Sequence, residues 1–336
     1  MDITMPIMAF VAAIILAVIL AMILIPVLRK LKVGQNIITE YGPTWHKDKQ
    51  GTPTMGGVIF AIAVVISFLL FGFVYYINGG DMAQVSQGVL PSSGLTSLIV
   101  AFLFGLIGFI DDFLKKIKKI NAGLGEMQKT VLSMLIAIGF IVYIVIKNNG
   151  RTDIAIPFLN LRLELSYFYY IFALIVILGT TNAVNFTDGV DGLCTSVTIP
   201  VMVFFAVTAA LKGAMELSVL SAAAAGALAG YLVFSWHPAK VMMGDTGSFF
   251  LGGLIVGIAF SLDIPVIIVV VGIIYFIEIM TVIIQRTYYK ITKGKRIFKM
   301  TPIHHQFEMD GWSEVKICMV FTSVTIVACV LALLFG

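Results

Sequence analysis

The chain has 336 residues, of which 60% are hydrophobic and only 12% are charged, and its mean hydropathy is +1.04. This composition excludes an ordinary soluble domain and indicates an integral membrane protein. The net charge of +4 is small, and no nucleic-acid partner is expected.

Apolar runs long enough to cross a bilayer, which requires roughly 20 residues, recur along the whole chain. They predict an all-α integral membrane protein with about ten transmembrane helices, forming a single polytopic domain over residues 1–336. The ninth run begins at Pro265 and is long enough to tilt or to project beyond the bilayer. In chain order, the candidate spans are 5–28, 54–76, 94–113, 128–147, 167–183, 194–211, 217–236, 247–262, 265–288 and 315–335.

Assigning the loops alternately to the two sides of the membrane concentrates the basic residues on one side. Of the 22 basic residues, only Lys147, Arg151, Arg162 and Lys212 fall on the other side. The positive-inside rule then predicts that the basic side is cytoplasmic and that both termini are extracytoplasmic. The predicted cytoplasmic loops are 29–53, 111–129, 182–193, 237–246 and 286–316.

Two local structures are expected in the loops. The outer segment 150–166 alternates apolar and polar residues, which is typical of a short hairpin. The last cytoplasmic loop mixes apolar and basic residues, which suggests an amphipathic helix over 288–298. No chemistry is expected on the outer side.

The segment 182–193, reading NAVNFTDGVDGL, carries amides and carboxylates three residues apart. On a helical turn such residues share a face, so Asn182, Asn185, Asp188 and Asp191 could point into one pocket. The alternative is a polar loop between two helices.

The first cytoplasmic loop ends in Lys47, Lys49 and the run GTPTMGG at 51–57. Glycine N–H groups and threonine hydroxyls before a helix offer a seat for an anion. The alternative is the ordinary beginning of a helix.

Two further cytoplasmic helix ends carry carboxylates. Asp111 and Asp112 are adjacent and repel, so they favour a nearby cation, and Lys115 lies on the helix face of Asp111. Asp245, in the run MGDTGS, is suited to a hard cation such as magnesium. The alternatives are an interfacial charge cluster at 111–115 and a helix cap at Asp245.

His304 and His305 lie in the basic last loop. Adjacent histidines on a helix point about 100° apart and chelate a metal poorly, so they suit phosphate contacts or proton transfer better. The alternative is a pair of solvated loop histidines. Glu278 is the clearest ionisable residue deep within a predicted span.

Carboxylates, lysines, histidines and glycine-rich turns on one membrane face together indicate phosphoryl transfer assisted by a divalent metal. Two other classes of protein are disfavoured. A transporter would need ionisable or broken-helix sites near the bilayer midplane, whereas these motifs lie at one membrane face. A structural scaffold would not need such a set of polar motifs.

The runs KQGTPTMGG, DDFLK, NFTDGVDGL, MGDTGS and PIHHQFE, in this order, resemble the polyprenyl-phosphate N-acetylhexosamine-1-phosphate transferases. The TPTMGG form and the histidine motif favour the phospho-N-acetylmuramoyl-pentapeptide transferase branch over the N-acetylglucosamine-1-phosphate branch. The resemblance spans nearly the whole chain.

The resemblance implies a multi-pass enzyme of the bacterial plasma membrane, usually a homodimer, with its active site on cytoplasmic loops. It implies transfer of phospho-N-acetylmuramoyl-pentapeptide from UDP-N-acetylmuramoyl-pentapeptide to the membrane lipid undecaprenyl phosphate. The products are lipid I and UMP, and Mg²⁺ is required. This is the first membrane step of peptidoglycan synthesis.

Matching the motifs residue by residue also implies roles. Asp245 resembles the magnesium ligand, Asp111 and Asp112 the catalytic acidic pair, and Lys115 a group that attracts phosphate. His304 and His305 resemble phosphate-contacting catalytic residues. The implied substrate-binding residues on the nucleoside side are Lys49, Thr54, Asn185, Asp188, Asp191 and Gln285, with Asn182 included in the same motif.

Three positions depart from the family pattern. Gln306 stands where a third histidine is frequent, Met242 where an aromatic residue is common, and Ser235 where an asparagine is common. The base-binding side of the site is therefore less well defined than the metal side. The sequence leaves open direct attack or a phosphorylated aspartate, and UDP-N-acetylglucosamine as an alternative donor.

Overall fold

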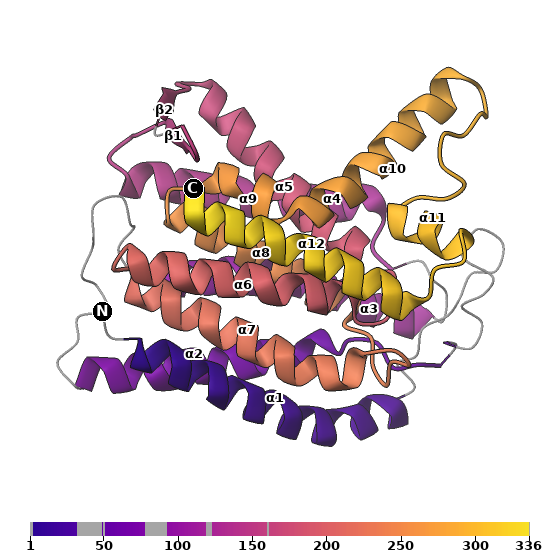
Figure 1. The fold of residues 1–336 in the computed structure, drawn as a ribbon, viewed down its shortest axis with the longest axis horizontal. Helices are drawn as coiled ribbons and strands as arrows, with labels where there is room; N and C mark the ends of the chain where they lie inside the picture. The colour runs from indigo at the N-terminus through magenta and orange to yellow at the C-terminus, as the bar shows by residue number, and fades with distance from the viewer. Residues whose placement is uncertain are drawn as a thin grey trace.

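The structure, a computed structural model, describes residues 3–31, 49, 51–77, 93–118, 123–159 and 161–335. The fold is an α-helical bundle with one small hairpin (Figure 1). The elements are α1 (Thr4–Lys30), α2 (Gly57–Ile77), α3 (Ser93–Lys118), α4 (Glu126–Lys147), β1 (Asp153–Ile156), β2 (Leu161–Glu164), α5 (Phe168–Thr187), α6 (Leu193–Leu211), α7 (Met215–Ser235), α8 (Gly244–Ser261), η2 (Pro265–Ile267), α9 (Ile268–Val271), α10 (Ile273–Ile291), α11 (Ile303–Met309) and α12 (Glu314–Phe335).

Helix α8 is the centre of the bundle and packs mainly against α3 and α5. Its small residues allow the backbones to approach closely. A Cβ added at Gly252 would lie 2.7 Å from the Cα of Thr181, and one at Gly257 would lie 2.8 Å from the Cα of Ser97. These close contacts fix the helix ends on which the polar motifs lie.

The apolar helices confirm a multi-pass membrane protein. Among the described residues, nine helices are long and apolar enough to span a bilayer, and the count reaches ten if a bent pair is one span. The beginning of α1 and the end of α12 lie at the end of the bundle that carries the hairpin, whereas α11 lies at the opposite end (Figure 1).

The bent pair corrects the prediction of one continuous span over 265–288 that tilts or projects beyond the bilayer. Residues Pro265–Val271 and Ile273–Ile291 are related by a bend of 86° at Gly272. A Cβ at Gly272 would lie 2.6 Å from the carbonyl oxygen of Ile268, so only glycine fits at this corner. Beyond it, α10 projects away from the bundle (Figure 1).

Several predicted loops are shorter than expected because the helices continue through the polar motifs. Helix α3 extends to Lys118, so Asp111 and Asp112 are helical and do not lie in a loop over 111–129. Helix α5 extends to Thr187, which leaves Asn182 and Asn185 on its last turns. The middle of the predicted loop 29–53 lies outside the described residues, apart from Lys49.

The amphipathic helix predicted over 288–298 is wrong. Helix α10 ends at Ile291, and the chain then turns through Lys293 and Gly294, both of which have positive φ angles. Helical structure returns only at α11, which carries the two histidines.

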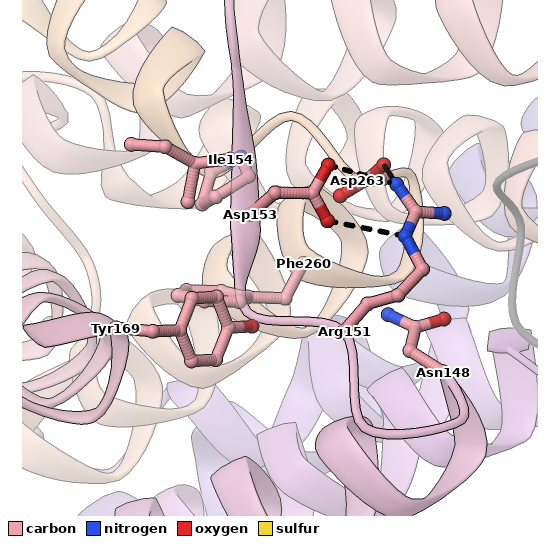
Figure 2. Close-up of a pocket in the computed structure, with 8 residues that line it drawn as sticks. Asn148, Arg151, Asp153, Ile154, Tyr169, Phe260 and Asp263 are labelled. Atoms are coloured by element: carbon pink, nitrogen blue, oxygen red, sulfur yellow. Dashed lines mark hydrogen bonds and ion pairs between the residues drawn. The ribbon is translucent and has the colours of Figure 1, made fainter. Parts of the chain in front are cut away.

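The hairpin predicted within 150–166 is confirmed, with β1 and β2 antiparallel and Asp153 opposite Glu164. Arg162 pairs with Asp153 and, at 2.6 Å, with Asp263 in the turn after α8. Arg151 also binds Asp153, beside a cavity of about 10 Å³ (Figure 2). These ion pairs attach the hairpin to the bundle.

Candidate active site

Three carboxylates meet where the end of α3 faces the beginning of α8. Each of Asp111, Asp112 and Asp245 offers an oxygen, and these oxygens lie within 4.8 Å of one another. Asp111 and Asp112 are buried, whereas the Asp245 side chain is 17% exposed. The sequence predicted these three residues as the acidic centre, and the structure brings them together.

Glycines make this meeting sterically feasible. A Cβ at Gly108 would lie 2.0 Å from the carbonyl oxygen of Asp245. Gly244, with φ of +68°, also faces the Asp112 carboxylate, which a Cβ there would approach to 2.6 Å. The first turn of α8 can therefore lie directly against α3.

Asp112 caps helix α8 across the helix interface. Its Oδ2 accepts hydrogen bonds from the backbone N–H of Thr246 at 3.0 Å and from the Thr246 hydroxyl at 2.7 Å. The alternative in which Asp245 merely caps α8 is therefore wrong, because a carboxylate from another helix fills that role. Asp245 is left to face the open side of the cluster.

Two lysines neutralise much of this negative charge. Lys115 Nζ lies 2.6 Å from Asp111 and 3.0 Å from Asp245. Lys129 Nζ, from the first turns of α4, lies 2.9 Å from Asp111 and 2.7 Å from Asp245. The sequence predicted Lys115 from its helical spacing, but it gave no local signal for Lys129, which reaches the cluster only through the packing of α4.

The end of α5 borders the same cluster. The amide nitrogen of Asn185 donates to Asp245 Oδ1 at 2.8 Å and to the Ser248 hydroxyl at 2.9 Å. Asp188 lies just beyond α5, and burial, together with the carboxylates of Asp245 and Asp112, raises its pKa well above the ordinary value.

A second polar cluster joins four segments around Lys49. Its ammonium lies 2.8 Å from Asp191 and 2.5 Å from Glu314 at the beginning of α12. His237 Nδ1 lies 3.1 Å from Asp191, which also accepts the backbone N–H of Ala239. Glu314 and His237 are far from Asp191 in sequence, so only the fold reveals them.

The charges in this second cluster stabilise one another. Burial alone would raise the pKa of Asp191, but hydrogen bonding and attraction from Lys49 keep it below the ordinary value. Burial also disfavours the charged form of Lys49, which on its own would lower the pKa of this lysine. Glu314 and Asp191 outweigh burial, so the pKa of Lys49 is raised. Both groups are therefore charged at neutral pH, as an ion pair.

The two predicted histidines are buried and not solvated, which excludes the alternative of loop histidines in solvent. His304 has no exposed surface, and its Nδ1 lies 3.1 Å from Glu278. His305 Nδ1 lies 2.6 Å from Glu308. A carboxylate therefore lies beside each imidazole.

Comparisons with known proteins now identify the family. A model of glycosyl transferase family 4 matches residues 94–263, and a phospho-N-acetylmuramoyl-pentapeptide-transferase signature matches residues 49–60. A phospho-N-acetylmuramoyl-pentapeptide-transferase of Clostridium botulinum is 47% identical over 91% of this chain and 89% of that protein. The chain belongs to the phospho-N-acetylmuramoyl-pentapeptide-transferase family.

Other members of this transferase family match over almost the whole chain. The Clostridium perfringens protein is 46% identical over 97% of both chains. The Listeria monocytogenes protein is 39% identical over 99% of this chain and 98% of its own. The resemblance seen in the motifs is confirmed.

The transferase signature falls on a segment that docks against the residues preceding α8. The N–H groups of Gly56 and Gly57 donate to the carbonyl oxygens of Met242 and Met243 at 2.9 and 3.0 Å. These two donors are therefore not open to an anion, which corrects part of the expected anion seat. Thr54 lies half-buried in the same segment.

Two predicted substrate-binding residues of this transferase point elsewhere. Asn182 is exposed, and its amide donates to the carbonyl oxygen of Leu178 on its own helix. The Gln285 amide binds the backbone of Ile297 and Phe298, so it braces the loop after α10. For both residues, a substrate contact stays a prediction.

Proposed function

We propose that this protein transfers phospho-N-acetylmuramoyl-pentapeptide from UDP to undecaprenyl phosphate, which forms lipid I and UMP. The cluster of Asp111, Asp112 and Asp245 with its two lysines is the observation that carries the proposal within this family. It lies at the ends of apolar helices, where a water-soluble nucleotide and a lipid phosphate can both arrive.

We also propose that the cluster holds Mg²⁺. Its three donor side chains are all carboxylates, which are the ligands that hard cations prefer. Three carboxylates outnumber the two lysines that face them, so the described residues leave negative charge for a cation. Asp245, the partly exposed member, would be the principal ligand, and the metal would offset phosphate charge.

The proposed chemistry is direct displacement. An oxygen of the lipid phosphate attacks the phosphorus that carries the sugar, and a new P–O bond forms. The bond from that phosphorus to the bridging oxygen breaks, and its electron pair leaves on the phosphate of UMP. The attacking oxygen is already anionic, so the barrier is mainly charge repulsion and alignment.

The engagement of both members of the acidic pair supports direct displacement over a phosphorylated aspartate. Asp112 is bonded to the N-terminus of α8, and Asp111 Oδ1 accepts the N–H of Leu124 at 2.7 Å. The other oxygen of Asp111, Oδ2, is paired with Lys115 and Lys129, and these positive charges make it a weaker nucleophile. Lys115 and Lys129 would instead attract the incoming phosphates.

The second cluster would receive the nucleoside end of the donor. Lys49 and Asp191 offer a donor and an acceptor side by side, as a uracil edge requires. His237, whose side chain is 43% exposed, provides a flat ring beside them, where the chain lacks an aromatic residue at Met242. We propose a homodimer in the bacterial plasma membrane, with one domain per chain and this face cytoplasmic.

Product analysis with two donors tests the substrate assignment. The purified protein, undecaprenyl phosphate and Mg²⁺ are incubated with UDP-N-acetylmuramoyl-pentapeptide or with UDP-N-acetylglucosamine. Mass spectrometry then identifies the lipid product. We expect lipid-linked product from the muramoyl donor alone. Product from the glucosamine donor alone would move the protein to the other branch.

A further inference from the structure

Glu278 is a buried carboxylate that the proposed chemistry has not used. It has no exposed surface, and it lies on the buried face of α10 with Ile274, Thr281 and Gln285. Burying an ionised carboxylate is strongly unfavourable unless a partner compensates its charge. An apolar side chain at this position would avoid the desolvation of a charge, so a carboxylate here calls for a functional or structural explanation.

Its partner is His304. The Glu278 Oε1 lies 3.1 Å from His304 Nδ1, and both side chains are fully buried. This contact lacks the geometry of an ordinary hydrogen bond, and no other described residue forms a hydrogen bond with either carboxylate oxygen of Glu278 or either ring nitrogen of His304. The carboxylate is therefore committed to one edge of the imidazole ring.

The opposite edge of the ring faces the turn between α5 and α6. A Cβ at Gly189 would lie 2.2 Å from His304 Nε2 and 2.7 Å from its Cε1. Gly189 separates Asp188 from Val190, in the turn that also supplies Asp191. Because glycine has no side chain, His304 Nε2 can approach the turn that joins the two polar clusters.

We propose that Glu278 is a positioning residue, which holds His304 with a proton on Nδ1 and directs Nε2 toward the turn at Gly189. The inference rests on the proposed function, because it concerns how a predicted phosphate-contacting histidine is aimed. The carboxylate accepts the Nδ1 proton and fixes both the tautomer and the ring orientation, as carboxylates do behind other functional histidines.

The rest of α10 supports this arrangement. Gln285 lies two turns beyond Glu278 on the same face and binds the backbone of the loop that leads to α11. Gln285 thus fixes the loop, while Glu278 fixes the ring. The bent, projecting helix carries both anchors of the histidine segment.

Nitrogen NMR of the histidines tests the tautomer directly. The chain has only 4 histidines, so ¹⁵N-histidine labelling of the whole protein in detergent gives few signals, and His304→Gln assigns the one of interest. We expect a protonated Nδ1 for His304 in the wild type and in Glu278→Gln, whose amide oxygen still accepts. In Glu278→Leu the proton should move to Nε2, whereas the His305 signal should stay unchanged.

Kinetics provides the second readout. Glu278→Leu should lower kcat by about 10- to 100-fold with little change in the donor KM, the magnitude typical of groups that orient a functional histidine. Glu278→Gln should retain more activity than Glu278→Leu. Thr281→Val is the matched control, since among the described residues its hydroxyl bonds only the carbonyl oxygen of Glu278 on the same helix. It should retain both activity and the His304 signal.

The outcomes separate the competing explanations. If Glu278 only anchors α11, folded Glu278→Leu should be less stable yet keep kcat and the Nδ1 proton, and that result would overturn the inference. A wild-type His304 with its proton on Nε2 alone would overturn it as well. Because the NMR measurement needs no turnover, an inactive wild type would contradict the proposed function without deciding the tautomer.

Discussion

Asp188 is half-buried beside other carboxylates, and this environment opposes its ionisation. Its pKa is raised well above 3.8 by burial and by nearby Asp245 and Asp112. The folded protein therefore favours the neutral acid, whereas the unfolded chain ionises at its ordinary pKa. Stability is consequently lost as the pH rises from about 3.8 to the raised folded value.

The loss of stability with rising pH gives a prediction for Asp188→Asn. Without added metal, the variant should melt at a higher temperature than the wild type at pH 8, and the difference should shrink as the pH falls toward 4. Thermal unfolding in detergent across this pH range measures it. A variant that is less stable than the wild type at every pH would contradict the assigned environment.

Lys129 is the active-site cation that the sequence did not reveal. Lys129→Met keeps most of the side-chain volume but leaves Asp111 and Asp245 with one neutralising lysine fewer. We expect turnover to fall by roughly 10²-fold, since one preorganised charge is lost. Lys116→Met, one residue beyond Lys115 on the last turns of α3, is the control and should retain activity in the same assay.

At the level of the elements, the site exists because the backbones of α3 and α8 approach closely at Gly108, where no side chain separates them. Gly108→Ala would place a Cβ 2.0 Å from the backbone oxygen of Asp245, so the helices must separate. We expect a loss of stability of about 1–3 kcal/mol together with loss of activity. Melting temperature and turnover measured on the same preparation check both effects.

Gly139 on α4 is the matched control for that change. A Cβ there would meet nothing within 4 Å. Gly139→Ala should therefore be neutral or stabilise the helix by at most about 1 kcal/mol. Equal damage from the two substitutions would show that helix contact at Gly108 is not what holds the site.

The sequence predicted helices well and helix ends poorly. Apolar length located the spans, because a bilayer requires that length. Polar residues at 111–118 and 182–187 suggested loops, but both segments stay helical since their side chains find partners on neighbouring helices. The sequence did not predict the bend at Gly272, because a long apolar run shows that a segment could cross the membrane but not whether it is straight.

The same limit explains the residues of the site. Motifs predicted Asp111, Asp112 and Asp245, and the helical spacing predicted Lys115. Lys129 and the partners of Asp191 belong to no such motif, and only tertiary packing brings them close. Gln285 was assigned to the substrate by resemblance, but its amide binds backbone, a contact that depends on the loop after α10.

For the whole molecule, the distribution of charge predicts the orientation. The hairpin end carries few basic residues, and the end with the carboxylate cluster carries most of them, so the latter should be cytoplasmic. Native cysteines are buried, so an impermeant maleimide should report introduced ones. We expect it to label Leu159→Cys in intact cells and Lys295→Cys only after permeabilisation, and the reverse pattern would contradict the orientation.

The central claim is that a metal-assisted acidic cluster transfers the sugar phosphate to a lipid. The most direct measurement is UMP release by the purified protein with UDP-N-acetylmuramoyl-pentapeptide, with and without undecaprenyl phosphate and Mg²⁺. We predict release only when both are present, and a fall of at least about 10³-fold in folded Asp245→Asn. Release that needs no lipid acceptor, or an Asp245→Asn protein with wild-type magnesium dependence, would contradict the account.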